Sequence, residues 1–215
     1  MLNGYGSTET GGGILAARIG DTADGSVGYP FPGIDVRVVD EAGHRVADGT
    51  VGELICRTPS LRVADGGAGA GEGWYKTGDL ARVGQRGEIH IVGRSRDLII
   101  RGGLKIVPAA VERVLSAHPA VAECSVVGMA DKLAGERIVA FIVPTDGQPP
   151  TVAELAARCG DSLAAHEIPD HVLAVSELPR AESGEVRKTE LRAMAARALQ
   201  AGPTRQATPQ GGPVR

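Results

Sequence analysis

Three chemically different side chains, Tyr5, Thr8 and Glu9, stand close together near the start of this 215-residue chain. An aromatic ring offers a flat face to a base, a hydroxyl can bind a phosphate oxygen, and a carboxylate is a hard oxygen ligand for Mg²⁺. Gly4 and Gly6 flank the tyrosine, and glycine lets a backbone approach a ligand closely. The motif is therefore compatible with a nucleotide site on a glycine-flanked turn, and equally with a polar glycine-rich loop that binds nothing.

Two common phosphate-binding loops are excluded by the sequence around this motif. A Walker loop requires a Gly-Lys-Ser/Thr run, and none follows here. A Rossmann fingerprint requires a preceding strand, and the sequence predicts none. A nucleotide bound by this motif must therefore be held in another way.

Two further charged residues could complete such a site. Asp79 follows Gly78 in the segment Trp74–Leu80, and its carboxylate could accept hydrogen bonds from adjacent hydroxyls such as a ribose diol. The alternative is an aspartate that stabilises its own turn. Arg94, in Gly93–Gly103, presents a planar fork of donors that suits hydroxyls or phosphate. The alternative for Arg94 is a surface salt bridge.

In their order and spacing, these segments resemble the adenylate-forming enzymes, over residues 3 to about 192. The segments that carry the resemblance are Asn3–Thr10, Gly25–Gly33, Val51–Leu54, Trp74–Leu80, Gly93–Gly103, Lys105–Glu112, His118–Val121 and Leu178–Arg180. Two of them, Lys105–Glu112 and His118–Val121, look more like acyl-CoA synthetases than peptide-synthetase adenylation domains. The resemblance implies an ATP-dependent ligase for a small carboxylic acid: ATP and the acid give an acyl-adenylate and pyrophosphate, and the CoA thiol then displaces AMP.

The resemblance also implies a role for each residue of the first motif. Tyr5 would stack on adenine, with Gly6 beside the nucleotide. Thr8 would bind a phosphate oxygen, and Glu9 would hold Mg²⁺; these two are expected to be catalytic. Rate enhancement in this family comes from positioning and from electrostatic stabilisation of charge on phosphorus.

Further roles follow from the later segments. Asp79 would hold the ribose hydroxyls, and Arg94 would assist there as a cofactor-binding and catalytic residue. Arg96 occupies the hinge position, where the family usually has Asp or Lys, and a few residues absorb the large backbone change of such a closure. Gly102 and Gly103 would lie beside the CoA thiol tunnel.

One departure from the family pattern concerns its catalytic lysine. The last motif reads Leu-Pro-Arg-x-x-Ser/Thr-Gly-Lys, and here it ends in Glu185. That lysine bridges the acid and the α-phosphate, and removing one such group costs on the order of 10²–10³ in rate. We therefore expect impaired adenylation, with thioester formation from a supplied adenylate less affected. Lys188, three residues on, is the alternative cation.

A second departure concerns length. The family's Ser/Thr/Gly-rich phosphate loop and most of its acid pocket lie upstream of the tyrosine motif, and neither is present in this sequence. Residues 1–93 would then be the end of a large AMP-binding domain, with partly exposed apolar faces. The chain is expected to be a gene fragment or mis-started reading frame, or one half of a split enzyme whose other chain supplies the missing domain.

The secondary structure expected to position these residues differs between the two parts of the chain. Before residue 93, strands are predicted at Val36–Asp40 and Gly52–Cys56, and a glycine-rich loop at 64–73. The later elements are strands at Leu98–Ile100, Val121–Met129, Arg137–Val143 and Val172–Val175, and helices at Pro108–Pro119, from Thr151 with a capping box to Glu154, and at Lys188–Leu199.

The predicted fold class is α+β. A β-rich remnant of the large domain's barrel subdomain (1–93) precedes a hinge (94–97), a small α+β domain with helices packed on a short sheet (98–199) and a disordered tail (200–215).

Composition limits the other classes of function. A net charge of −3 gives no sign of a nucleic-acid partner. Three cysteines, with no Cys-x-x-Cys, argue against a disulfide scaffold or zinc site and favour the cytoplasm. No apolar run reaches the roughly 18 residues of a membrane helix. The histidines have no metal-binding spacing, and Glu112, Arg113 and Asp131 are expected to be solvated.

Two other functions stay open. The chain could instead belong to an adenylation domain that transfers the acyl group to the phosphopantetheine of a carrier protein. A degenerate module could bind nucleotide, CoA or a protein without turnover, which the glutamate at position 185 favours.

Overall fold

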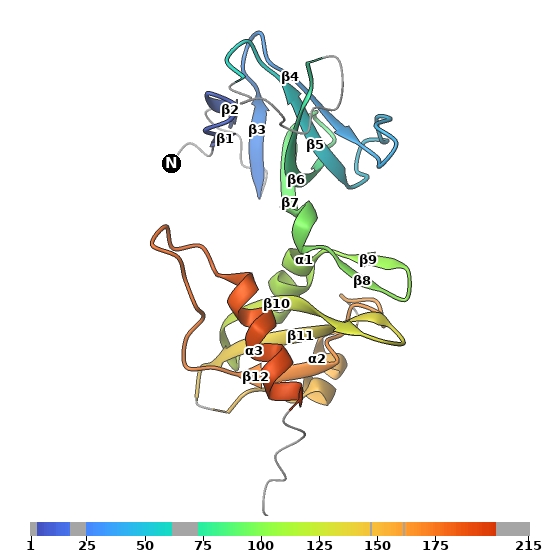
Figure 1. The fold of residues 1–215 in the computed structure, drawn as a ribbon, viewed down its shortest axis with the longest axis vertical. Coiled ribbons are helices and arrows are strands. Elements are labelled where there is room, and N and C mark those ends of the chain that lie inside the picture. Colours follow the sequence, from blue (N-terminus) through green and yellow to red (C-terminus); the bar gives the residue numbers. More distant parts are fainter. Residues whose placement is uncertain (1–3, 18–24, 62–72, 147, 161, 201–215) are drawn as a thin grey trace, which may run out of the picture. The chain divides into compact units, whose positions relative to one another are not determined.

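The computed structural model describes residues 4–17, 25–61, 73–146, 148–160 and 162–200, which form two compact units (Figure 1). The first unit contains the residues up to Leu98 together with Val107–Ala110. The second contains Ile99–Ile106 and the residues from Val111 onwards. Within the described ranges, no helix is long and apolar enough to cross a membrane.

The first unit is built on a seven-stranded antiparallel sheet in the order β1-β2-β3-β7-β6-β5-β4. Its strands are β1 (Gly4–Ser7), β2 (Gly12–Ala16), β3 (Ser26–Pro30), β4 (Asp35–Val39), β5 (Gly52–Arg57), β6 (Tyr75–Val83) and β7 (Ile89–Arg94). A short 3₁₀ helix, η1 (Ser95–Asp97), follows β7.

Alternation along the strands of this sheet produces the core of the first unit. On β4, Val36 and Val38 both face the core, where they lie opposite Cys56 and Leu54 of β5. Arg37, between the two valines, lies over the ring of Trp74 at 4.3 Å from its centroid. Because side chains alternate between the two faces of a strand, the predicted apolar–polar pattern of β4 places Val36 and Val38 together on the face that packs against this core.

The second unit combines a mixed sheet with three helices. Its elements are β8 (Ile99–Arg101), β9 (Leu104–Ile106), the part of α1 (Pro108–Leu115) from Val111 onwards, β10 (Val121–Asp131), β11 (Gly135–Pro144), α2 (Val152–Cys159), β12 (His171–Ala174) and α3 (Lys188–Gln200). The sheet runs β10-β11-β8-β9, and β12 pairs with β11 in parallel.

Strand β11 is buried on both faces, which explains its continuous apolar run. Ile138 and Ile142 belong to the core that contains Leu155 of α2. Phe141, between them, belongs to the opposite core, which contains Leu191 of α3. The fold class predicted from the sequence, α+β, is confirmed.

The local predictions for the helices were mostly correct. Thr151 caps α2: its Oγ1 accepts from the Glu154 N–H at 3.2 Å, and the Glu154 carboxylate accepts from the Thr151 N–H at 2.7 Å. Helix α1 ends at Leu115, earlier than predicted, and His118 lies beyond it, where its Nδ1 accepts from the Ala120 N–H. The loop expected at 64–73 and the tail lie mainly outside the described residues.

The expectation that Glu112 and Asp131 are solvated was wrong. The Asp131 carboxylate accepts from the backbone N–H groups of Leu133 and Ala134, each at 2.9 Å, and pairs with Arg137 at 2.6 Å. These backbone bonds, with help from Arg137, lower the pKa of Asp131 to about 2. Glu112 accepts from a backbone N–H of β10 at 2.7 Å. Asp131 therefore stabilises the turn between β10 and β11, and Glu112 joins α1 to β10.

Candidate functional site

The tyrosine motif lies on a strand and on the turn that follows it, not wholly on a turn as predicted. Tyr5 belongs to β1, and the turn begins at Thr8, whose carbonyl accepts from the Gly11 N–H at 3.1 Å. Thr10 is 3% exposed, and its Oγ1 lies 2.9 Å from the Ser7 carbonyl and accepts from the Ser7 N–H at 2.9 Å. Thr10, which the sequence analysis did not single out, therefore holds this turn closed.

Gly6 is required by the close approach of β1 and β2. The pairing shifts register between Tyr5 and Gly6, where β1 lies opposite the glycines of β2. A Cβ at Gly6 would lie 2.2 Å from the Gly12 carbonyl oxygen. No side chain fits at that distance, so the glycine brings the two backbones together beside the tyrosine.

The side chains of Tyr5, Asp79 and Arg94 meet, although they come from three strands. The Tyr5 hydroxyl donates to Asp79 Oδ2, and Arg94 Nε lies 3.0 Å from Asp79 Oδ1. Asp79 and Arg94 are direct partners in the β6–β7 register. Asp79 is 4% exposed, whereas the Arg94 side chain is 47% exposed. Asp79 therefore lies within a strand and does not stabilise its own turn.

The electrostatics of this cluster follow from burial and charge. Burial raises the pKa of the Tyr5 phenol, and its hydrogen bond to Asp79 raises it further. Tyr5 therefore stays protonated and remains a donor at neutral pH. Thr77 supports the cluster from β6, since its Oγ1 accepts from the Asp79 N–H at 3.1 Å and donates to the Leu54 carbonyl at 2.8 Å. Nothing in the sequence pattern had indicated Thr77.

Glu9 belongs to the same electrostatic neighbourhood. Hydrogen bonds with its own backbone and with the Ser7 side chain lower the pKa of this exposed carboxyl, and the charge of Arg94 adds to the effect. Glu9 is thus ionised at neutral pH and open to solvent. Among the described residues, no group of three or more His, Cys, Asp or Glu side chains could hold a metal. One carboxylate is nevertheless what Mg²⁺ commonly takes from a protein when substrate phosphates supply other ligands.

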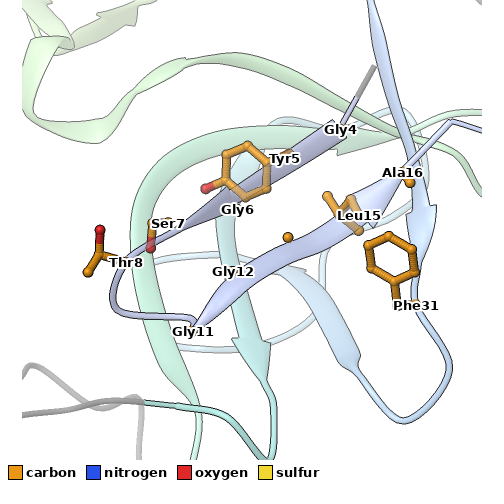
Figure 2. Close-up of a pocket in the computed structure, with 11 residues that line it drawn as sticks. Gly4, Tyr5, Gly6, Ser7, Thr8, Gly11, Gly12, Leu15, Ala16 and Phe31 are labelled. Atoms are coloured by element: carbon orange, nitrogen blue, oxygen red, sulfur yellow. The ribbon is translucent and has the colours of Figure 1, made fainter. Parts of the chain in front are cut away.

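A pocket of about 690 Å³ opens beside the tyrosine (Figure 2). It is lined by Gly4, Tyr5, Gly6, Ser7, Thr8, Gly11, Gly12, Gly13, Leu15, Ala16 and Phe31. Most of these residues lie on β1 and β2, and Phe31 joins them from the segment after β3. The size is typical of a small-molecule site. Phe31, which the sequence analysis did not assign to a site, is 44% exposed.

The remaining predicted residues lie elsewhere. Arg96 is an exposed residue of η1 in the first unit. Gly102 and Gly103 form the turn between β8 and β9 in the second unit, with φ of +57° and +82°. Two consecutive residues with positive φ suit a two-residue hairpin turn, which favours Gly-Gly.

Glu185 lies in a small hairpin of the second unit. Arg180 and Val186 form its bridge, and the Ala181 N–H donates to the Glu185 carbonyl at 2.8 Å. The Arg180 guanidinium donates to the Gly184 carbonyl at 2.9 Å. The Glu185 side chain itself is exposed.

Comparison with known proteins gives two family matches. Residues 1–65 match the family described as AMP-binding enzyme, and residues 110–185 match the AMP-binding enzyme C-terminal domain. The segment that contains Tyr5, Thr8 and Glu9 lies in the first match, and Glu185 is the last residue of the second.

Among curated relatives, an indoleacetate–CoA ligase of Aromatoleum aromaticum is 35% identical over 201 residues, which are 90% of this chain and 39% of that protein. A fatty acid–[acyl-carrier-protein] ligase of Streptomyces coeruleorubidus is 35% identical over 199 residues, 87% of this chain and 38% of that protein. Among solved structures, ATP-bound MatB from Rhodopseudomonas palustris is 32% identical, with a TM-score of 0.82 over 90% of this chain and 40% of that chain. The chain thus spans about two fifths of the length of these relatives.

Proposed function

Because the chain belongs to the AMP-binding enzyme family, we propose that it is the C-terminal portion of an ATP-dependent acyl-CoA synthetase and that its first unit binds the adenylate. The observation that carries the proposal is the meeting of Tyr5, Asp79 and Arg94, with Tyr5 also lining the 690 Å³ pocket. Tyr5 and Asp79 are 74 positions apart in the sequence, and folding brings the aromatic side chain of one to the buried carboxylate of the other. A nucleoside offers matching groups: a flat base and a diol.

These contacts support the roles proposed for the residues of the first unit. Asp79 accepts from the ribose hydroxyls, and Arg94, half exposed beside it, contributes donors at the edge of the site. Tyr5 and Gly6 face the base. Thr8 lines the pocket and offers its hydroxyl to a phosphate oxygen.

Glu9 is proposed as the protein ligand of Mg²⁺. Its lowered pKa keeps the carboxylate ionised and able to hold a divalent cation at neutral pH. When bound, Mg²⁺ would neutralise charge on the phosphate oxygens. The proposed substrate is a small carboxylic acid.

The second unit is proposed to supply the thioester half-reaction. Gly102 and Gly103 carry no side chain into the space around their turn, and a Cβ added to either residue would have no atom within 4 Å. This open space is compatible with a place for the turn beside the CoA thiol. A hinge at residues 94–97, with Arg96, is supported by the division of the chain into compact units after Leu98.

Impaired adenylation is part of the proposal. Glu185 is exposed on its hairpin and places an anion where the family motif has a cation. Phosphate and carboxylate substrates are both anionic, so a glutamate at that position opposes their approach. We place the protein in the cytoplasm, with a separate chain that carries the rest of an AMP-binding domain as a proposed partner.

Two alternative functions each have an observation in their favour. Similarity to a fatty acid–[acyl-carrier-protein] ligase favours a carrier protein as acyl acceptor. Glu185 favours a module that binds nucleotide or CoA without turnover.

Calorimetry with AMP and with CoA, beside an assay of pyrophosphate release, tests the proposal on the 215-residue chain. We expect AMP to bind and Asp79→Asn to weaken it by at least about tenfold, because an amide replaces a charged acceptor. Binding without pyrophosphate release supports the module or the impaired ligase. Absence of AMP binding by the unmodified chain would reject a nucleotide site in this unit.

A further inference from the structure

The Asp79 carboxylate is buried and needs partners for both of its oxygens. Its side chain is 6% exposed. An ionised carboxylate removed from water is strongly disfavoured unless hydrogen bonds or opposite charges compensate for the lost hydration. Among the described residues, two side chains supply this compensation: Arg94 at Oδ1 and Tyr5 at Oδ2.

Arg94 alone leaves the orientation of the carboxylate free. It contacts Oδ1 through Nε at 3.0 Å, and its side chain is 47% exposed, so solvent competes for it. A single contact to one oxygen also permits rotation of the carboxylate plane, because the terminal torsion of aspartate is broad. A second donor on the other oxygen removes that freedom.

Tyr5 provides this second donor from a separate strand. Its hydroxyl donates to Oδ2, and its ring is held by packing against the core of the first unit. The backbone of Asp79 is fixed independently by Thr77. Strand pairing, the Thr77 hydrogen bond and the two side-chain contacts thus restrain the backbone and both carboxylate oxygens of Asp79.

We propose that the Tyr5 hydroxyl is a positioning group that fixes the Asp79 carboxylate for a ribose diol. Tyr5 would then serve nucleotide binding twice, through its ring and through its hydroxyl. An ionised carboxylate has about four lone-pair sites, and Tyr5 and Arg94 use two of them. Two acceptor sites are left, which equals the number of hydroxyls in a ribose diol. This inference rests on the proposed nucleotide site.

The test distinguishes the contribution of the Tyr5 hydroxyl to binding from that of its ring, and the contribution of the ribose diol from that of the base. Binding of AMP and of 2′,3′-dideoxyadenosine monophosphate is measured by calorimetry for the unmodified chain and for Tyr5→Phe, which keeps the ring. Tyr75→Phe is the matched control, because among the described residues the Tyr75 hydroxyl makes no hydrogen bond with Asp79.

We expect Tyr5→Phe to weaken AMP binding about tenfold and to change binding of the dideoxy nucleotide less than about threefold. Tyr75→Phe should change both by less than about twofold. Unchanged AMP binding in Tyr5→Phe would overturn the positioning role, and so would an equal loss for both nucleotides, which indicates a general effect on the pocket.

A ligand-free measurement distinguishes failure of this inference from failure of the nucleotide function. The midpoints of unfolding of Tyr5→Phe, Asp79→Asn and the double variant form a mutant cycle. Non-additive shifts support the contact, and additive shifts overturn the positioning role whether or not AMP binds. Absence of AMP binding by the unmodified chain, together with non-additive shifts, would reject the nucleotide and the diol role while leaving the contact in place.

Discussion

Lys188, the first residue of α3, forms an ion pair with Glu112 of α1, with Nζ 2.9 Å from Oε1. Nζ also lies 3.4 Å from the Val126 carbonyl of β10. The two charged side chains are 19% and 21% exposed. Lys188 was the alternative cation for the position held by Glu185, but these contacts give it a structural role that joins two helices and a strand.

Replacement of Lys188 should therefore destabilise the second unit. Lys188→Met leaves Glu112 largely buried without its cation, and we expect the free energy of unfolding to fall by about 1–3 kcal/mol, below the range for fully buried pairs because water still reaches this one. Urea denaturation followed by circular dichroism measures the loss.

Arg187→Met is a suitable control for that experiment. Arg187 directly precedes α3 and pairs with Glu190 in the first turn of that helix, and both side chains are about half exposed. An exposed pair of this kind contributes about 0–1 kcal/mol. If Lys188→Met and Arg187→Met have the same small effect, the structural role assigned to Lys188 is wrong.

The ionised Asp131 carboxylate should make the free energy of unfolding fall at low pH. Its pKa in the folded state is about 2, below its ordinary value of 3.8, because backbone N–H groups and Arg137 favour the charged form. The resulting stabilisation is present above about pH 4 and is lost as the pH falls from about 4 towards 2. Asp131→Asn should flatten this part of the curve of unfolding free energy against pH.

Asp48→Asn is the matched control for the acid titration. Asp48 is an exposed aspartate whose partner, Arg45, lies 3.6 Å away. An exposed pair of this kind contributes about 0–1 kcal/mol, so Asp48→Asn should change the unfolding free energy little. An identical slope in Asp131→Asn and the unmodified chain would show that the turn between β10 and β11 does not depend on the charge of Asp131.

Glu185→Lys tests the proposed cause of impaired adenylation. In a full-length protein with this C-terminal portion, a lysine at position 185 should raise the rate of pyrophosphate release by on the order of 10²–10³. Thioester formation from a supplied acyl-adenylate should change much less, because the predicted role concerns the α-phosphate. Glu185→Gln separates removal of the anion from gain of the cation and should give a smaller increase. Equal adenylation rates in all three proteins would refute the role assigned to this position.

The sequence predicted those features that depend on neighbouring residues. The capping box of Thr151 and Glu154 and the alternation of Val36 and Val38 are local patterns, and the structure contains both. The ion pair between Glu112 and Lys188 joins residues 76 positions apart, and no local period indicates such a partner. Glu112 was wrongly expected to be solvated for this reason, since its partners come from β10 and α3. The partners of Asp131 lie only two to six positions along the chain, but they meet its carboxylate only when the turn between β10 and β11 forms.

The candidate site shows the same limit. Spacing within the motif suggested a ligand-binding loop, but a resemblance to a family was needed to relate Tyr5 to Asp79. Neither periodicity nor resemblance indicated that the Tyr5 hydroxyl would contact the Asp79 carboxylate. That contact depends on the order of seven strands, in which β1 and β6 are not neighbours.

The glycine inside the tyrosine motif gives a test of how strongly the site depends on the approach of two backbones. A methyl group at Gly6 would lie 2.2 Å from the Gly12 carbonyl oxygen, so Gly6→Ala must separate β1 from β2. Overpacking of this kind costs about 1–3 kcal/mol. Because Tyr5 precedes Gly6 on β1, its hydroxyl should also move relative to Asp79.

Gly4→Ala on the same strand is the control, since its Cβ would lie at an ordinary 3.5 Å from the Leu15 carbonyl oxygen. We expect Gly6→Ala to lower the unfolding midpoint and to weaken AMP binding at least about tenfold, with the unfolding midpoint of Gly4→Ala close to that of the unmodified chain. AMP binding by Gly6→Ala equal to that of the unmodified chain would show that the position of Tyr5 does not depend on the close approach of β1 and β2.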